Sequence, residues 1–181
     1  MNRMILSIVS ATPLLLLVSC GRADRQVRIS TTSPAAAFPK LRALDTLFEV
    51  AASIRSADAE PLRALHVSTN WFQVAQNPPL LGRAFLADEG LVPTVAILSS
   101  DAWQRLFGKD PTIIGHIIDV GTSKCTVVGI VPERSGYDID VYLPWSPTGD
   151  GYSLIALLRP GVSLKQAQAA MDASGVKAKL E

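Results

Sequence analysis

The chain has 181 residues, of which 48% are hydrophobic and 18% charged, with 12 glycines, 12 prolines and two cysteines, so its composition excludes a disordered chain, a collagen-like repeat and a small disulfide-stapled protein. The 17 basic residues include Arg3, and without the first 19 residues the rest of the chain carries 16 basic and 16 acidic residues, with no basic run. A neutral body of this kind lacks the positive surface that nucleic-acid binding requires.

The first twenty residues have the features of an export signal. Arg3 precedes the apolar stretch Met4–Val18, which contains Pro13 and is shorter than the roughly 20 residues of a membrane-spanning helix. The stretch ends in Leu17-Val18-Ser19-Cys20, which resembles the lipobox of bacterial lipoproteins. We expect residues 1–19 to be a signal peptide and Cys20 to carry a membrane lipid. The alternatives are an uncleaved signal anchor and the remnant of a transmembrane helix.

The remaining chain divides into a tether, one folded domain and a short tail. Residues 20–34 are polar and rich in serine and threonine, which predicts a tether with at most a short strand at Val27–Ile29. Residues 35–175 contain the predicted helices and strands and are interpreted as one folded domain. Residues 176–181 are interpreted as a tail.

Hydrophobic periodicity and turn residues predict the elements of the domain. In chain order these are a helix over 39–47, strands over 48–55 and 62–68, a short helix over 70–75, a strand over 95–98, a helix ending at Gly108, strands over 117–120, 125–131, 140–143 and 154–158, and a final helix with a capping box at Ser163 and Gln166. The strand over 125–131 is apolar on both faces, so we expect it to be central in its sheet. Strands outnumber helices and occur both in hairpins and in βα pairs, which predicts an α+β fold.

Candidate catalytic or metal-binding residues are few. Asp138 and Asp140 share one face of an extended chain and could bind a cation or act as acid and base. We favour the alternative, a polar edge strand leading into Tyr142. His66 and His116 are far apart in the sequence and are interpreted as solvated or hydrogen-bonded strand histidines.

The remaining distinctive side chains favour packing or surface contact. Cys125 lies in an apolar strand, where a thiol packs as a small buried hydrophobe. Trp103 is interpreted as a core residue because its helical spacing matches Phe107. Trp145 lies between two prolines in an expected surface loop, so Trp145 and Tyr142 are candidate contact residues. The sequence contains no phosphate-binding glycine loop and no nucleophile elbow, and we expect no cofactor and no catalytic residue.

Short motifs occur in a characteristic order between Pro39 and Ser174. They are Val67-Ser68-Thr69-Asn70-Trp71-Phe72, Leu81-Gly82-Arg83-Ala84-Phe85, Phe107-Gly108-Lys109-Asp110-Pro111, Thr126-Val127-Val128-Gly129-Ile130-Val131-Pro132 and Asp140-Val141-Tyr142-Leu143-Pro144-Trp145. This set resembles the MacB-like periplasmic core domain, the extracytoplasmic part of MacB/FtsX-type ABC transporter permeases. One departure is Ala75-Gln76-Asn77, which stands where the family usually has Leu-Gly-Val.

The resemblance implies a mixed-sheet, porter-like βαβ unit with an inserted, mostly β lobe. It also implies a non-catalytic, membrane-anchored domain of the cell envelope that faces the periplasm or exterior and contacts a protein partner in a transport or efflux complex. Within the motifs, Gly82 is expected to let the backbone turn, and Gly129 to mark a bulge or a close backbone approach. The alternatives are a truncated permease fragment and a periplasmic enzyme that uses Asp138 and Asp140.

Overall fold

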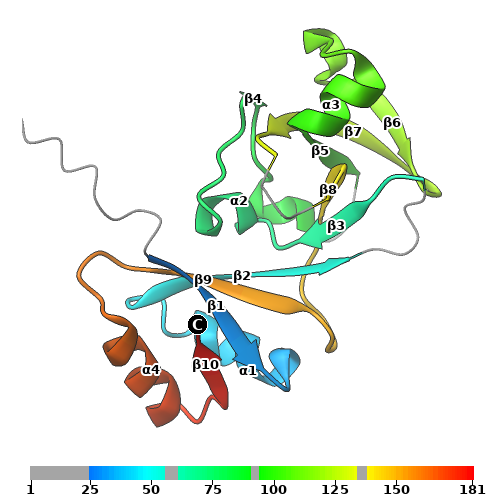
Figure 1. Ribbon diagram of the computed structural model, residues 1–181. Coiled ribbons are helices and arrows are strands. Elements are labelled where there is room, and N and C mark those ends of the chain that lie inside the picture. Colours follow the sequence, from blue (N-terminus) through cyan, green and yellow to red (C-terminus); the bar gives the residue numbers. More distant parts are fainter. Residues whose placement is uncertain (1–24, 56–60, 91–93, 134–137) are drawn as a thin grey trace, which may run out of the picture.

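The computed structural model describes residues 25–55, 61–90, 94–133 and 138–181, and Figure 1 shows them as two lobes connected by strands. One ten-stranded mixed sheet runs through both lobes in the order β10-β1-β9-β2-β3-β8-β5-β7-β4, and β6 pairs with β7. Together with the helices, this sheet confirms the α+β class. The expected signal peptide and Cys20 lie outside the described residues.

The first lobe consists of two interlocked βαβ units. Its elements are β1 (Gln26–Thr31), α1 (Pro34–Arg42), β2 (Phe48–Arg55), β9 (Ser153–Leu158), α4 (Leu164–Ala173) and β10 (Ala178–Leu180). β9 is antiparallel to both β1 and β2, and β10 is antiparallel to β1. The units β1-α1-β2 and β9-α4-β10 therefore each skip one strand, as in a split βαβ fold. This arrangement confirms the porter-like unit.

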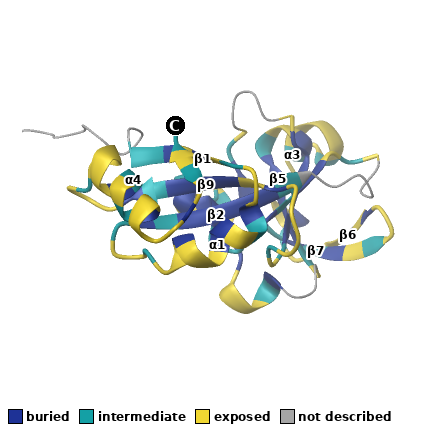
Figure 2. Ribbon diagram, turned by 90° about the horizontal axis from the view of Figure 1, so that it is seen from below, coloured by how far each residue is buried: buried dark blue, intermediate teal, exposed yellow. Residues whose placement is uncertain are grey.

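The two long helices of this lobe cover one face of its sheet. α1 and α4 lie in front of the strands in Figure 2, and their buried residues share a core with alternate residues of β1, β2 and β9. On α1 the buried positions include Ala37, Phe38 and Leu41, and on α4 they are Ala167 and Met171. These positions repeat with the helical period, so burial of one stripe fixes each helix on the sheet.

The second lobe is inserted between β2 and β9 and is mostly β. Its elements are β3 (Ala64–Val67), α2 (Trp71–Val74), β4 (Leu81–Gly82), η2 (Ala87–Gly90), β5 (Val95–Ser99), α3 (Ser100–Phe107), η3 (Pro111–Ile113), β6 (Ile117–Val120), β7 (Ser123–Val131) and β8 (Val141–Pro144). β7 pairs with β5 on one side and with β4 and β6 on the other, which confirms that it is central.

The expected tether, tail and first helix have different bounds in the structure. β1 lies inside the sheet between β10 and β9, so residues 26–34 belong to the domain and not to a tether. The expected tail contains β10, because Val176, Ala178 and Leu180 alternate toward the first-lobe core. The first helix spans Pro34–Arg42 instead of 39–47; it begins at Pro34 because proline at the first helical position has no amide hydrogen bond to lose.

Helix caps agree with the sequence. The Ser99 hydroxyl accepts a hydrogen bond from the Ala102 amide, and Gly108 ends α3 in the left-handed conformation. Ser163 and Gln166 form the predicted capping box of α4. Each cap satisfies backbone groups that the first or last helical turn leaves unpaired.

Replacing Gln76 with glycine is expected to raise the melting temperature by roughly 1–3 °C. Gln76 follows α2 with φ 52°, and the amide of Asn77 donates to the carbonyl of Phe72 across it. This C-terminal cap favours glycine because a side chain strains the left-handed conformation. The same substitution at Lys109, φ 61°, is a matched test. Thermal unfolding followed by circular dichroism checks both, and a decrease for both variants would contradict the strain argument.

Candidate interaction surface

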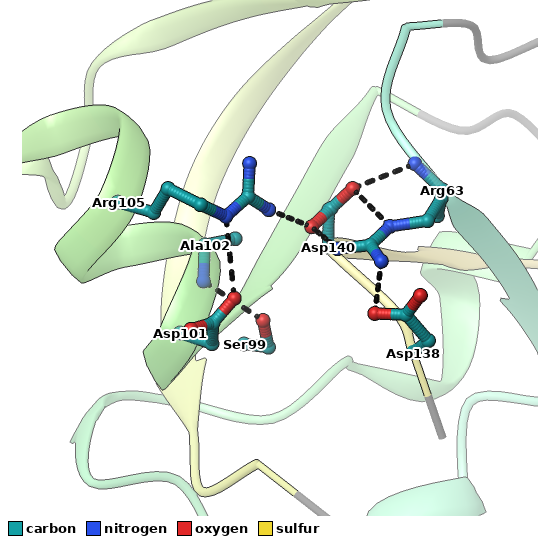
Figure 3. A network of polar contacts seen from close by, with 7 residues as sticks. All are labelled: Arg63, Ser99, Asp101, Ala102, Arg105, Asp138 and Asp140. Atoms are coloured by element: carbon teal, nitrogen blue, oxygen red, sulfur yellow. Dashed lines mark hydrogen bonds and ion pairs between the residues drawn. The ribbon is translucent and has the colours of Figure 1, made fainter. Parts of the chain in front are cut away.

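Asp140, one of the two candidate acidic residues, is the centre of a charged network. Its side chain is 3% exposed and lies between two arginine side chains (Figure 3). Oδ2 accepts hydrogen bonds from the backbone amide and Nε of Arg63, each at 2.9 Å, and Oδ1 accepts from Nη2 of Arg63 at 2.7 Å and from Nη2 of Arg105. The carboxylate thus connects the segment before β3 with α3 and with the start of β8.

Two exposed aspartates complete the network. Asp138, 75% exposed, pairs with Nη1 of Arg63, and Asp101 pairs with Arg105 at 3.3 Å. Hydrogen bonds from Arg63 hold the pKa of Asp140 below its usual range, and the bond to Asp140 raises the pKa of Arg63. Both groups therefore stay charged at neutral pH. β8 lies between β3 and β5, so the expectation of an edge strand at this position was wrong.

The two candidate contact residues differ in exposure. Tyr142 is 4% exposed and stacks edge-on against Phe72 with ring centroids 5.1 Å apart, so a role in surface contact is corrected to a role in the core. Trp145 is half-buried and packs edge-on against Tyr152 at 5.4 Å. Its amide donates to the carbonyl of Val67, which extends the pairing of β8 with β3. Contact through the exposed part of Trp145 stays a prediction.

Other singled-out residues are placed as follows. Cys125 is fully buried, which raises the pKa of its thiol, in agreement with the predicted packing role. His66 is half-buried on β3, whereas His116 is exposed just before β6 and not within a strand. Trp103 is partly buried against the second-lobe core, and its Nε1 donates to the carbonyl of Asp110 at 2.8 Å. Among the described residues no group of three or more His, Cys, Asp or Glu could hold a metal ion.

The sheet of the first lobe has a second face, which α1 and α4 do not cover. Because side chains alternate along a strand, the neighbours of its core residues point to this opposite face. It presents exposed Arg28 and Ser30 from β1, exposed Ser153 from β9 and half-buried Glu49 from β2. α2 packs over part of it, through contacts of its buried residues with Ala51 and Ile155. We call this surface the open sheet face.

Two hollows lie on the open sheet face, one on each side of α2. The larger, about 800 Å³, is lined by residues that include Arg25, Glu49, Gln76 and Arg159. There Oε2 of Glu49 accepts a hydrogen bond from Nε2 of Gln73 at 2.8 Å and lies 3.9 Å from Nη1 of Arg159. The smaller, about 550 Å³, is lined by residues that include Arg28, Ser53, Trp71 and Ser153. Among the residues that line the two hollows, three arginines stand against one glutamate, so the hollows carry a positive charge.

The sequence predicted parts of this surface but not their assembly. The pattern of Val27–Ile29 indicated a strand. Along it, polar Gln26, Arg28 and Ser30 alternate with apolar Val27 and Ile29. The arginine partners of Asp140 were missed, because Arg63 and Arg105 are distant in sequence and only the pairing of β3, β5 and β8 brings them together.

The family model of the MacB-like periplasmic core domain matches residues 1–174, including the apolar stretch before Cys20. The chain belongs to this family. Its members are periplasmic domains of MacB/FtsX-type ABC transporter permeases, so the family places this domain on the periplasmic side of the cell envelope. No helix among the described residues is both long and apolar enough to cross a membrane.

Curated and solved relatives agree with the family. The chain is 30% identical over 97 residues to a probable export ATP-binding/permease protein MacB of Pseudomonas entomophila, an alignment that covers 50% of this chain and only 14% of that protein. The periplasmic region of MacB from Actinobacillus actinomycetemcomitans has the same fold, with a TM-score of 0.67, 14% identity and coverage of 87% and 88% of the two chains.

Two further structures share the fold. A domain of a putative permease from Porphyromonas gingivalis superposes with a TM-score of 0.63 at 17% identity, covering 88% of this chain and 90% of that one. The extracellular domain of the ABC-type transporter YknZ from Gram-positive bacteria superposes with a TM-score of 0.60 at 17% identity, covering 86% and 99%. At these identities the likeness concerns the fold.

Proposed function

We propose that the chain is a non-catalytic contact domain of a transport- or efflux-related ABC transporter assembly, anchored in the envelope through a lipid on Cys20. The observation that carries the proposal is the family match over residues 1–174. The open sheet face supports it, because an exposed, partly polar surface that contains two hollows suits contact with another protein.

The chemistry of the acidic residues also favours a structural role over an enzymatic one. Both oxygens of Asp140 accept hydrogen bonds from arginine. Because its pKa is lowered, Asp140 is deprotonated near neutral pH and has no proton to donate to a substrate. Asp138 is bound to the same Arg63. A periplasmic enzyme built on these two residues would have to break the network that connects α3 with β8.

Anchoring through Cys20 is tested by replacement with alanine. We expect the wild-type chain to incorporate labelled fatty acid and to fractionate with membranes. Cys20→Ala is expected to lose both properties, because alanine has no thiol to carry the acyl chains on which stable attachment depends. Ser19→Ala keeps a small residue before the cysteine and serves as the control. Membrane attachment without label in both variants would support an uncleaved apolar anchor and contradict lipidation.

Partner contact is tested by capturing the full chain from gently solubilised membranes. We expect an ABC transporter permease or its ATP-binding subunit to co-purify with it in a near-stoichiometric amount. Arg28→Glu, which reverses a charge on the open sheet face, is expected to reduce this amount at least several-fold, whereas Lys165→Glu on the outer side of α4 leaves it unchanged. Recovery of the chain without a transporter subunit would contradict the proposed function.

A further inference from the structure

Strand β10 forms an edge of the sheet within the described residues, next to β1. Arg28 of β1 and Glu181 exchange both backbone hydrogen bonds, at 2.8 and 2.9 Å, and Ser30 lies opposite Lys179. In an antiparallel ladder, hydrogen-bonded pairs alternate with non-hydrogen-bonded pairs. Ala178 and Leu180 belong to non-hydrogen-bonded pairs, so their backbone N–H and C=O groups point away from β1. These groups are the ones that another strand would need.

A side chain from α4 occupies the position of that missing strand. Nε2 of Gln168 donates to the carbonyl of Ala178, and Oε1 of Gln168 accepts from the amide of Leu180, both at 3.0 Å. A carboxamide carries the same donor and acceptor as a peptide group, so Gln168 stands in for one peptide unit of a neighbouring strand. Nε2 also donates to Asp172 at 2.9 Å, which leaves the carboxamide a partner when the bonds to β10 break.

The surroundings of β10 have room for an extended chain. A hollow of about 1060 Å³ follows the strand between the end of β1 and α4, the two elements that flank β10 in the fold (Figure 1). Ala178 and Leu180 are half-buried against the first-lobe core on the side of α4. Lys179 is exposed and points to the opposite side, toward the open sheet face. An added strand would therefore meet apolar side chains on one side and a positive charge on the other.

We propose that the edge of β10 binds an extended segment of a partner protein as an additional strand, and that Gln168 covers this edge until the segment displaces it. The segment carries an acidic residue opposite Lys179, with apolar residues before and after it. This inference rests on the proposed function as a contact domain and specifies where, and with what chemistry, one contact is made.

The charge of Lys179 favours a different protein over a second copy of this chain. Two copies could pair their β10 strands antiparallel around Lys179, and Leu180 of each copy would then donate to Ala178 of the other. That register puts Lys179 directly opposite its own copy, and like charges at opposing positions destabilise a strand pair. An acidic residue at the same position stabilises it.

The test uses the full chain and a short synthetic peptide of valines with a single central glutamate, with exchange of the Leu180 amide followed by NMR. In Gln168→Ala we expect this amide to exchange faster, and peptide to restore its protection. Peptide is expected to bind this variant roughly fivefold to tenfold more tightly than the wild type, because it no longer displaces a carboxamide. Lys165→Ala, an exposed change on the same helix, is the control and keeps wild-type affinity.

A charge reversal tests the chemistry of the segment. Lys179→Glu is expected to reverse the preference, so that a valine–lysine peptide binds and the valine–glutamate peptide does not. Equal affinity of Gln168→Ala and wild type, an unprotected Leu180 amide in the presence of peptide, or dimers of Gln168→Ala that exclude peptide would each overturn the inference. Peptide binding without capture of a transporter subunit contradicts only the proposed function, and capture without peptide binding contradicts only this inference.

Discussion

Replacing Gly129 with alanine is expected to lower the free energy of unfolding by about 3 kcal/mol and the melting temperature by roughly 6–12 °C. Gly129 of β7 lies opposite Gly82 of β4, and a Cβ on Gly129 would lie far inside van der Waals contact with the carbonyl oxygen of Arg83. The amide of Arg83 donates to the carbonyl of Val128 at 2.8 Å, so the two backbones cannot separate without breaking this pairing.

The matched control is Gly161→Ala. Gly161 has φ +82° but no atom within 4 Å of an added Cβ, so only backbone strain opposes the substitution, at about 1 kcal/mol. Denaturant unfolding followed by circular dichroism compares the two variants. Equal losses of stability would contradict the steric argument at Gly129.

Replacing Asp140 with asparagine is expected to lower the free energy of unfolding at pH 7 by about 2 kcal/mol. The change keeps the shape of the side chain but removes the charge that Arg63 and Arg105 contact. Because both arginine side chains are half-exposed, water can solvate them in the variant, and the loss of unfolding free energy stays below that of a fully buried ion pair. Asp138→Asn is the matched control: Asp138 contacts the same Arg63 but is 75% exposed, so we expect a change within about 0.5 kcal/mol.

The stability that Asp140 contributes also depends on pH. Its pKa is lower in the folded state than the value of about 4 expected in the unfolded chain. The contribution is therefore complete above pH 4 and is lost as the pH falls from there through the folded-state pKa. The difference in unfolding free energy between wild type and Asp140→Asn should be largest near pH 7 and shrink toward pH 3. A difference that grows on acidification would contradict the ion-pair account.

Local signals in the sequence predicted most of the elements. The strand over 48–55 has the bounds of β2, and the capping box at Ser163 and the stop at Gly108 are where the sequence placed them. Gly82 turns the backbone with φ 72°, and the register of β5 and β7 shifts beside Gly129, as expected. The caps and the turn at Gly82 depend on residues that are close together in the chain, and Gly129 is a local signal even though its partners are distant.

The errors involve contacts between distant residues. β10 has only three residues, one of them a lysine, and it forms because β1 supplies a pairing partner about 150 residues earlier in the sequence. The sequence indicated an edge-strand or catalytic carboxylate at Asp140. In the fold, the segment before β3 and helix α3 place Arg63 and Arg105 against it. The alternation over Val176–Leu180 was a usable signal for β10, whereas no local pattern pairs Asp140 with its arginines.

The measurement that tests the central claim most directly is photo-crosslinking in intact cells from single positions on opposite faces of the first lobe. With a photoreactive residue in place of Arg28 on the open sheet face, the account predicts a crosslink to a subunit of an ABC transporter, identified by mass spectrometry. The same residue in place of Lys165 on α4 should give none. Equal crosslinking from both positions, or crosslinks from Lys165 alone, would contradict the account.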